Sequence, residues 1–197
     1  MNNSGVQRVV PIVLVLIVII VAVAALVSVG RSLFGGSEEP VVNNGKEALL
    51  NTSLDRSVRM TVRGPIVGDN LFHSYTITAT PTTRNLTTYQ GYLQSQLETS
   101  DLANNSKAYE QFVYALDRAD MMEGTELEGD ADDMRGVCAT GRLYRYEVLQ
   151  GSNVVKSLWT TTCRDAKGSL KATNQELLRL FRTQIPDVAK VTSKVRL

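Results

Sequence analysis

Cys138 and Cys163 are the residues of this 197-residue chain whose type and spacing most directly suggest chemistry. Paired thiols can form a redox couple, bind a metal ion, supply a catalytic nucleophile or close a structural disulfide. A thioredoxin-like redox couple would be spaced C-x-x-C, and that spacing is absent. A metal site needs more ligands than two thiols, and no C-x₂-C pair or neighbouring histidine supplies them.

A catalytic thiol usually needs a histidine base, and the position of the one histidine bears on that alternative. His73 lies in a different predicted strand from either cysteine, so a thiol–imidazole pair is disfavoured. A structural disulfide needs only an oxidising compartment. We therefore predict a disulfide between Cys138 and Cys163, which would close a loop of about 25 residues.

The segment 120–136 carries seven carboxylates and raises the question of calcium binding. Glu128, Asp130 and Asp132 alternate as EF-hand ligands do, but the central glycine and the closing glutamate of that loop are missing. The pattern favours a solvated acidic loop. These three carboxylates are only a weak candidate metal site, and we expect no cofactor.

The remaining candidate residues have simpler interpretations. Trp159, Tyr144 and Tyr146 share strand faces with the cysteines, which predicts that they are core residues and not a ligand platform. His73 is expected to be an ordinary strand residue. The chain has no G-x-S-x-G, H-E-x-x-H or G-x-x-x-x-G-K-[ST] motif. We assign no catalytic or cofactor-binding residue, although a Ser-Lys or carboxylate-pair enzyme would leave no local motif.

An apolar segment near the N-terminus bears on whether the chain reaches the oxidising compartment that a disulfide requires. The 21 residues from Val9 to Val29 contain no charge. As a helix they would rise roughly 31 Å, which matches the hydrocarbon core of a bilayer. Ser28-Val29-Gly30 offers small residues to a signal peptidase, but the run is longer than the usual 7–15 residues of a cleaved signal. We predict a retained signal anchor, that is, one transmembrane helix.

Flanking charge does not orient this helix, because Arg8 and Arg31 balance each other under the positive-inside rule. The predicted disulfide breaks the tie and places the bulk of the chain outside the cytoplasm, at the cell membrane. The expected organisation is a short cytoplasmic tail (1–8), the transmembrane helix (9–29), a linker or stalk (30–55), an extracytoplasmic domain (56–188) and a basic C-terminal tail (189–197).

The periodicity within the domain predicts an α+β fold, with an antiparallel sheet of two hairpins and a candidate fifth strand, packed by two helices on one face. Asn105 or Ser106 is the expected N-cap of the first helix, and Thr173 with Glu176 forms a T-x-x-E capping box for the second. The expected strands are 57–67, 72–80, 84–89, 138–149 and 153–163, and the expected helices are 104–120 and 173–185, with a short one at 46–54.

The register of the second hairpin is left open by the sequence. A turn centred between Gln150 and Gly151 sets Cys138 directly opposite Cys163. A Gly151-Ser152 turn is better hairpin chemistry, but it leaves the cysteines diagonal unless a β-bulge intervenes. Both registers bring the two thiols near each other.

The runs AYEQFVYALDRADMMEG, GVCATGRLYRYEVL, SLWTTTC and LFRTQIPD resemble small, uncharacterised, N-terminally anchored surface proteins of Saccharibacteria-type episymbiotic bacteria. The resemblance covers roughly residues 56–187 and concerns overall pattern. It implies a bacterial cell-surface protein and transfers no active residues. A type IV pilin is disfavoured, because Gly5 is not followed by an apolar helix with a glutamate at its fifth position.

The balance of charged residues limits the classes of molecule that the protein is expected to bind. With 21 basic and 20 acidic side chains the formal net charge is +1, which argues against nucleic acid. We expect a single-pass anchored, non-catalytic interaction or structural module at the cell envelope, with an unidentified envelope protein as partner. The alternatives are an envelope enzyme without a recognisable motif and a small-ligand or lipid carrier.

Overall fold

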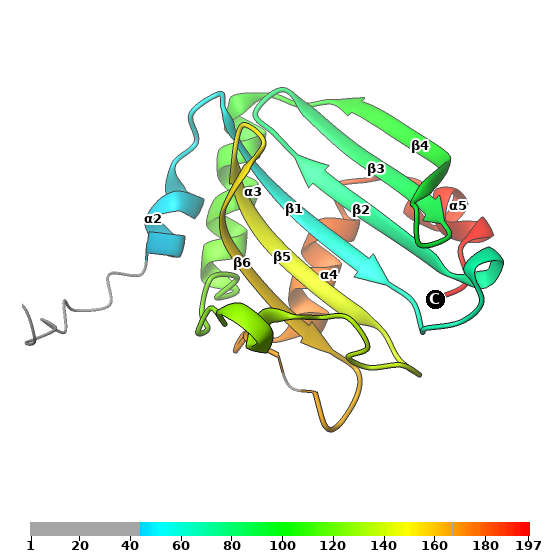
Figure 1. Cartoon of the computed structure of the whole chain (residues 1–197). Coiled ribbons are helices and arrows are strands. Elements are labelled where there is room, and N and C mark those ends of the chain that lie inside the picture. Colours follow the sequence, from blue (N-terminus) through cyan, green and yellow to red (C-terminus); the bar gives the residue numbers. More distant parts are fainter. Residues whose placement is uncertain (1–43, 167) are drawn as a thin grey trace, which may run out of the picture. The chain divides into compact units, whose positions relative to one another are not determined.

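A six-stranded antiparallel sheet, ordered β4-β3-β2-β1-β5-β6, organises the computed structural model, which describes residues 44–166 and 168–197 (Figure 1). These residues belong to one compact unit, Asn43–Leu197. The strands are β1 (Arg56–Arg63), β2 (His73–Ala79), β3 (Thr83–Gln90), β4 (Ser95–Ala103), β5 (Leu143–Gln150) and β6 (Asn153–Thr161). The helices are α2 (Asn44–Leu50), α3 (Ser106–Arg118), α4 (Asn174–Arg182) and α5 (Val188–Val191), with 3-10 turns η1 (Asp69–Leu71), η2 (Gly129–Asp132) and η3 (Thr192–Lys194).

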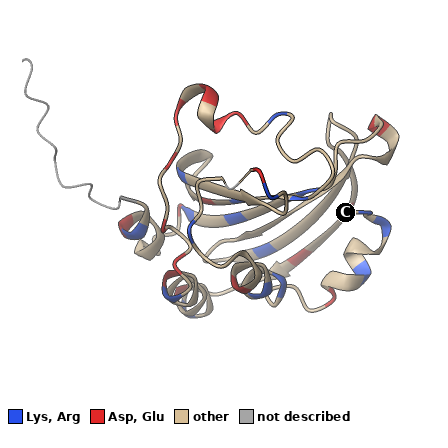
Figure 2. Cartoon of the chain, turned by 90° about the horizontal axis from the view of Figure 1, so that it is seen from below, with Lys and Arg blue, Asp and Glu red and all other residues tan. Residues whose placement is uncertain are grey.

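The two faces of the sheet have different partners. Val58, Met60 and Val62 of β1 are buried, while Arg59 and Thr61 between them point to the opposite face, as expected for a strand with period two. Figure 2 shows the helices on one side of the sheet and the acidic η2 turn on the other. The hydrophobic core therefore lies between the sheet and the helices.

The core joins the strands to the apolar stripe of each helix. Tyr146 of β5 packs against Phe181 of α4, and Phe181 makes an edge-to-face contact with Phe112 of α3, with ring centroids 5.3 Å apart. The core side chains that are essentially inaccessible to solvent include Tyr109, Tyr146, Phe181, Leu49, Met60, Ile77, Leu86, Leu116, Met121, Leu158, Leu177 and Ile185.

The predicted α+β class is confirmed, but the sheet has one more strand than expected. The first hairpin forms as predicted, since β1 pairs antiparallel with β2, and the candidate strand at 84–89 is β3. The edge strand β4 was not predicted from the sequence. Its nine residues, SQLETSDLA, contain few apolar side chains, because one of its edges and most of its surface face solvent.

The second hairpin turns at Gly151-Ser152 and is bulged. Gln150 pairs with Asn153, and the register shifts by one residue after Val148, which pairs with Lys156. The shift turns Trp159 to the face opposite Tyr144 and Tyr146, so the expectation that all three share one face is wrong.

The cysteines lie outside the strands in which they were expected. Cys138 precedes β5, which begins only at Leu143, and Cys163 follows β6, which ends at Thr161. Cys138 has a positive φ of 60°, which is incompatible with a regular strand. The residues between Cys138 and β5 form turns instead of extending the ladder.

The helix predictions hold for position and differ at one cap. Asn105 caps α3, since its side chain accepts a hydrogen bond from the Ala108 N–H at 3.0 Å. Thr173 precedes α4 but makes no side-chain cap bond, so the predicted capping box with Glu176 does not form. Residues 189–197, expected as a basic tail, include parts of α5 and η3, and Val191 is buried.

The predicted transmembrane segment, Val9–Val29, lies outside the described residues. Within residues 44–166 and 168–197, no helix has both the length and the apolar character needed to cross a bilayer.

Candidate binding site

The predicted cysteine pairing is present in the structure. The Sγ atoms of Cys138 and Cys163 are 2.10 Å apart, and the Cα atoms are 5.3 Å apart. The disulfide joins the turn before β5 to the end of β6. Between its two ends, the Arg142 N–H donates to Thr162 Oγ1 at 2.9 Å and the Thr162 N–H donates to the Arg142 carbonyl at 3.0 Å. Backbone and disulfide together fix the position of Arg142.

The three candidate metal ligands lie at η2, above the sheet face that the helices leave uncovered (Figure 2). Asp132 Oδ1 accepts a hydrogen bond from the Trp159 indole at 2.9 Å, so this carboxylate serves to hold the acidic segment on β6. Glu128 and Asp130 precede Asp132 in the sequence and lie at the start of the same turn. Across residues 44–166 and 168–197, no group of three histidine, cysteine or acidic residues is arranged to hold a metal ion.

His73 and Trp159 have structural partners. His73 is buried in β2, and its Nδ1 lies 2.8 Å from the Leu71 carbonyl, the separation of a hydrogen bond donated by the ring. Trp159 is buried, and its indole N–H donates the hydrogen bond to Asp132 described above. Neither side chain lines the cavity described next.

A row of three residues across the sheet supplies the floor of a partly open cavity. Val62 of β1 pairs with Tyr75 of β2 on one side and with Tyr144 of β5 on the other. The row places two phenol rings on the helix-covered face with a small apolar residue between them. Both tyrosines are only 4% exposed.

The cavity above this row has a volume of about 180 Å³. We call it the tyrosine cavity. Its walls come from β1, β2, the turn before β5, β5, α4 and the C-terminal segment. The lining residues are Val62, Tyr75, Arg142, Tyr144, Leu178, Arg182, Thr192, Val195 and Leu197. Its lining includes two guanidinium groups, two phenols and Leu197, and it contains no aspartate or glutamate side chain.

The hydroxyl groups of the tyrosine cavity have no protein partner. Neither phenol hydroxyl makes a hydrogen bond to another described residue, and neither oxygen is among the fully buried side-chain atoms that lack a partner, so both are accessible from the cavity. A hydroxyl group in an accessible cavity can bond to water or to a ligand. Two such groups that open into the same cavity therefore indicate a site for a polar ligand.

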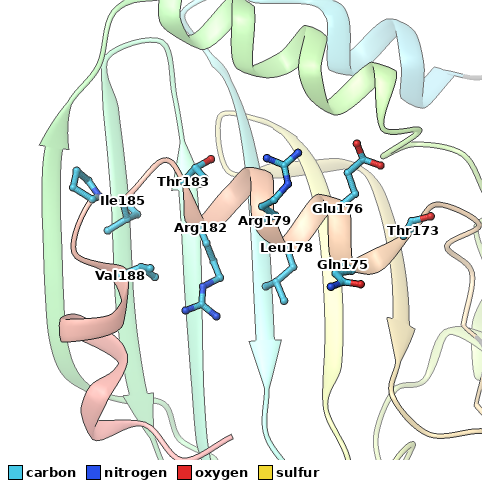
Figure 3. Close-up of a pocket in the computed structure, with 10 residues that line it drawn as sticks. Thr173, Gln175, Glu176, Leu178, Arg179, Arg182, Thr183, Ile185 and Val188 are labelled. Carbon is cyan, nitrogen blue, oxygen red and sulfur yellow. The ribbon is translucent and has the colours of Figure 1, made fainter.

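A second and larger depression lies beside the cavity. It has a volume of about 820 Å³ and is open to solvent. We call it the α4 pocket, which is lined by Thr173, Gln175, Glu176, Leu178, Arg179, Arg182, Thr183, Ile185, Pro186 and Val188. Figure 3 shows Gln175, Leu178 and Arg182 on one side of α4 and Glu176, Arg179 and Thr183 on the other.

Leu178 and Arg182 line both the α4 pocket and the tyrosine cavity. The pocket is lined by one helix and the turn after it, whereas the cavity is built from six separate parts of the chain. The cavity is therefore the better-defined site, and the pocket is its neighbouring surface.

Burial raises the pKa of Tyr75 to about 12, an effect that the guanidinium of Arg182 partly offsets. Because this pKa exceeds the ordinary tyrosine pKa near 10, the folded chain keeps a proton that the unfolded chain loses between pH 10 and about 12. The ionisation of Tyr75 therefore leaves the free energy of unfolding unchanged below pH 10 and lowers it as the pH rises from 10 to about 12.

We expect Tyr75→Phe to remove about 2–3 kcal/mol of this alkaline loss of stability. Urea unfolding of the two proteins at pH 8, 10, 11 and 12 would measure the difference. Tyr109 and Tyr146 also have pKa values raised by burial, so the variant should retain part of the decline. Identical pH profiles for both proteins would contradict the predicted protonation state of Tyr75.

The chain matches no protein-family model, and no curated protein matches it. The residues of the tyrosine cavity were not identified from the sequence. Tyr144 was expected to be ordinary core, Tyr75 was placed only on a strand face, and Arg142 and Arg182 were not singled out. The only available signal was the alternation that puts Tyr75 and Tyr144 on the inner faces of their strands.

Proposed function

We propose that the protein is a single-pass membrane-anchored, extracytoplasmic and non-catalytic binding module. Its binding site is the tyrosine cavity together with the adjoining α4 pocket. The observation that carries this proposal is that the hydroxyls of Tyr75 and Tyr144, which have no hydrogen-bond partner among the described residues, line the same accessible cavity as Arg142 and Arg182.

The ionisable groups of the cavity support binding over acid–base catalysis. With a pKa of about 12, Tyr75 keeps its proton at neutral pH and acts as a hydrogen-bond donor, not as a general base. Arginine remains charged at every physiological pH. Such groups hold a ligand in place, whereas proton transfer near neutral pH needs a group that titrates there.

The proposed location rests on the sequence. The uncharged segment Val9–Val29 has the length of a membrane-spanning helix, and a disulfide of the kind formed by Cys138 and Cys163 persists in oxidising surroundings. Protease added to intact cells should then degrade the domain and leave the anchor in the membrane. Protection of the domain until the cells are lysed would contradict the proposed sidedness.

Binding through the α4 pocket can be tested by site-specific photo-cross-linking of the full chain in its native membrane. A photoreactive residue at Gln175, which lies on the same side of α4 as Arg182 (Figure 3), should give a discrete adduct. The matched control is Gln111, an exposed glutamine of α3 outside both cavity and pocket. Arg182→Gln should weaken the Gln175 adduct.

A small-ligand carrier is the second candidate, and the small volume of the tyrosine cavity favours it. The two functions give different results. A partner-binding module yields a protein adduct at Gln175, whereas a carrier yields none but still binds a small molecule. Equal adducts at Gln175 and Gln111 would contradict a specific site on α4.

A further inference from the structure

The charge of the tyrosine cavity defines the kind of ligand that fits it. Arg142 and Arg182 contribute two permanent positive charges, and the lining contains no acidic side chain. Within the described part of the chain, the Arg182 side chain makes no hydrogen bond or ion pair. Its positive charge therefore has no acidic side chain as a partner in the cavity.

The four polar side chains can all donate hydrogen bonds toward the same space. Arg142, Arg182, Tyr75 and Tyr144 line the same cavity, and the charges of both guanidinium groups act to lower the pKa of Tyr75 against the effect of burial. Each phenol retains an O–H donor, and each arginine presents a fork of N–H donors. Donors without matching acceptors favour a ligand that supplies several acceptor oxygens and negative charge.

One contact already shows an oxygen atom bound at this site. An Arg142 Nη atom donates to a main-chain oxygen of Leu197, the last residue of the printed sequence, at 2.7 Å. The guanidinium is therefore oriented by the C-terminal segment, while its remaining N–H groups are available to a ligand. Arg182 lines the same cavity from α4, so a ligand oxygen in the cavity has a second guanidinium group within the same lining.

The volume and the neighbouring surface limit the ligand further. A cavity of about 180 Å³ is about six times the roughly 30 Å³ that one water molecule occupies in the liquid, so it has room for one compact group. The adjoining α4 pocket offers apolar side chains at Leu178, Ile185, Pro186 and Val188. A ligand with a charged head and an apolar remainder would contact both.

We propose that the tyrosine cavity binds an oxyanionic group, a carboxylate or a phosphate, whose apolar remainder lies along the α4 pocket. This inference rests on the proposed binding function and adds the chemical class of the ligand. Tyr75 and Tyr144 donate hydrogen bonds to the oxyanion, and Arg142 and Arg182 neutralise its charge.

The test uses the full chain in nanodiscs of zwitterionic lipid, with empty nanodiscs subtracted. Hexanoate, hexyl phosphate, hexanol and hexyltrimethylammonium share one alkyl chain and differ only in the head group. Saturation-transfer NMR titrations should detect binding of one or both anions, and whichever anion binds identifies the source as carboxylate or phosphate. The alcohol and the cation should bind at least tenfold more weakly.

Variants connect this binding to the cavity. Arg182→Gln and Tyr75→Phe should each weaken anion binding about tenfold, since each removes a charge-assisted hydrogen bond. Replacing Arg142 and Arg182 together should abolish it. The control is Arg118→Gln, an exposed arginine of α3 outside the site, which should change binding less than twofold. Thermal unfolding of each variant shows whether the domain is still folded.

Three results would overturn the inference. They are equal binding of the cation and the anions, no binding of any probe, or loss of binding in Arg118→Gln equal to that in Arg182→Gln. The outcome is independent of the cross-linking test. A Gln175 adduct without anion binding would retain the binding module and reject only the oxyanion as its ligand.

Discussion

Glu147→Gln is expected to destabilise the folded domain by about 3 kcal/mol, because it removes the negative charge that two arginines share. Glu147 lies on the sheet face opposite the helices, and its side chain is only 2% exposed. Arg59, its cross-strand neighbour on β1, donates to Glu147 Oε2 at 2.7 Å, and Arg145 Nη1 lies 3.7 Å from Oε1.

The cost is large because the arginines cannot fully recover their hydration. Arg59 and Arg145 side chains are about one-third exposed, and the buried Arg145 Nε has no hydrogen-bond partner. Arg145 also lies 3.3 Å from the Met134 sulfur, a weak acceptor that cannot replace a carboxylate. Removing one member of a buried ion pair leaves uncompensated charge, which costs more than the pair itself contributes.

Urea unfolding of the full chain in nanodiscs would measure this effect. Glu110→Gln is the matched control, since Glu110 is an exposed glutamate of α3 and should change stability by less than about 0.5 kcal/mol. Comparable stability for Glu147→Gln and Glu110→Gln would show that the arginines do not depend on this carboxylate.

Replacing both cysteines, as Cys138→Ala with Cys163→Ala, is expected to lower the free energy of unfolding by about 3.5 kcal/mol. The two residues are separated by 25 positions, and the chain-entropy relation for a loop of that length gives this value. The loss comes mainly from the unfolded chain, which gains freedom when the loop is opened.

The wild-type chain under reducing conditions provides the control for this prediction. Its stability should fall to that of the double variant, whereas reductant should leave the variant unchanged. A wild-type chain that is insensitive to reductant would mean that the bond contributes nothing to stability.

The fold could be predicted from the sequence where local pattern and tertiary contact agree. The stripe of Tyr109, Phe112, Val113 and Leu116 predicted α3, and all four residues are buried. The alternation in β1 predicted its buried face. The edge strand β4 escaped prediction because its outward surface has no partner that would require apolar residues.

The sequence also could not predict the pairing register of the β5–β6 hairpin, which a one-residue bulge changes. The bulge next to Val148 moves Trp159 to the other face of the sheet, where the acidic segment covers it. The sequence allowed both a straight and a bulged ladder, so it could not decide between the two faces. Whether the two cysteines lie directly opposite each other depended on the same register and could not be predicted either. Both registers nevertheless placed the two cysteines near each other.

The candidate site depends on pairings that no local pattern reveals. Tyr75 and Tyr144 become neighbours only because β1 inserts between β2 and β5, and β5 follows β1 by about 80 positions in the chain. Arg182 reaches them from α4. The tyrosine alternation was visible in the sequence, but the strand order that makes it a cavity floor was not.

The disulfide also has a consequence for the timing of ligand recognition. Arg142 lies between the two sulfur atoms in the chain, and its main chain is held by the residue next to Cys163. A newly synthesised polypeptide with reduced sulfurs would carry this arginine on a loose turn and would lose affinity, because a mobile cation must be ordered on binding. Hexanoate or hexyl phosphate titrations repeated with reductant would report the difference. If the domain is exported as proposed, oxidation of the cysteines and binding of the ligand would take place in the same compartment.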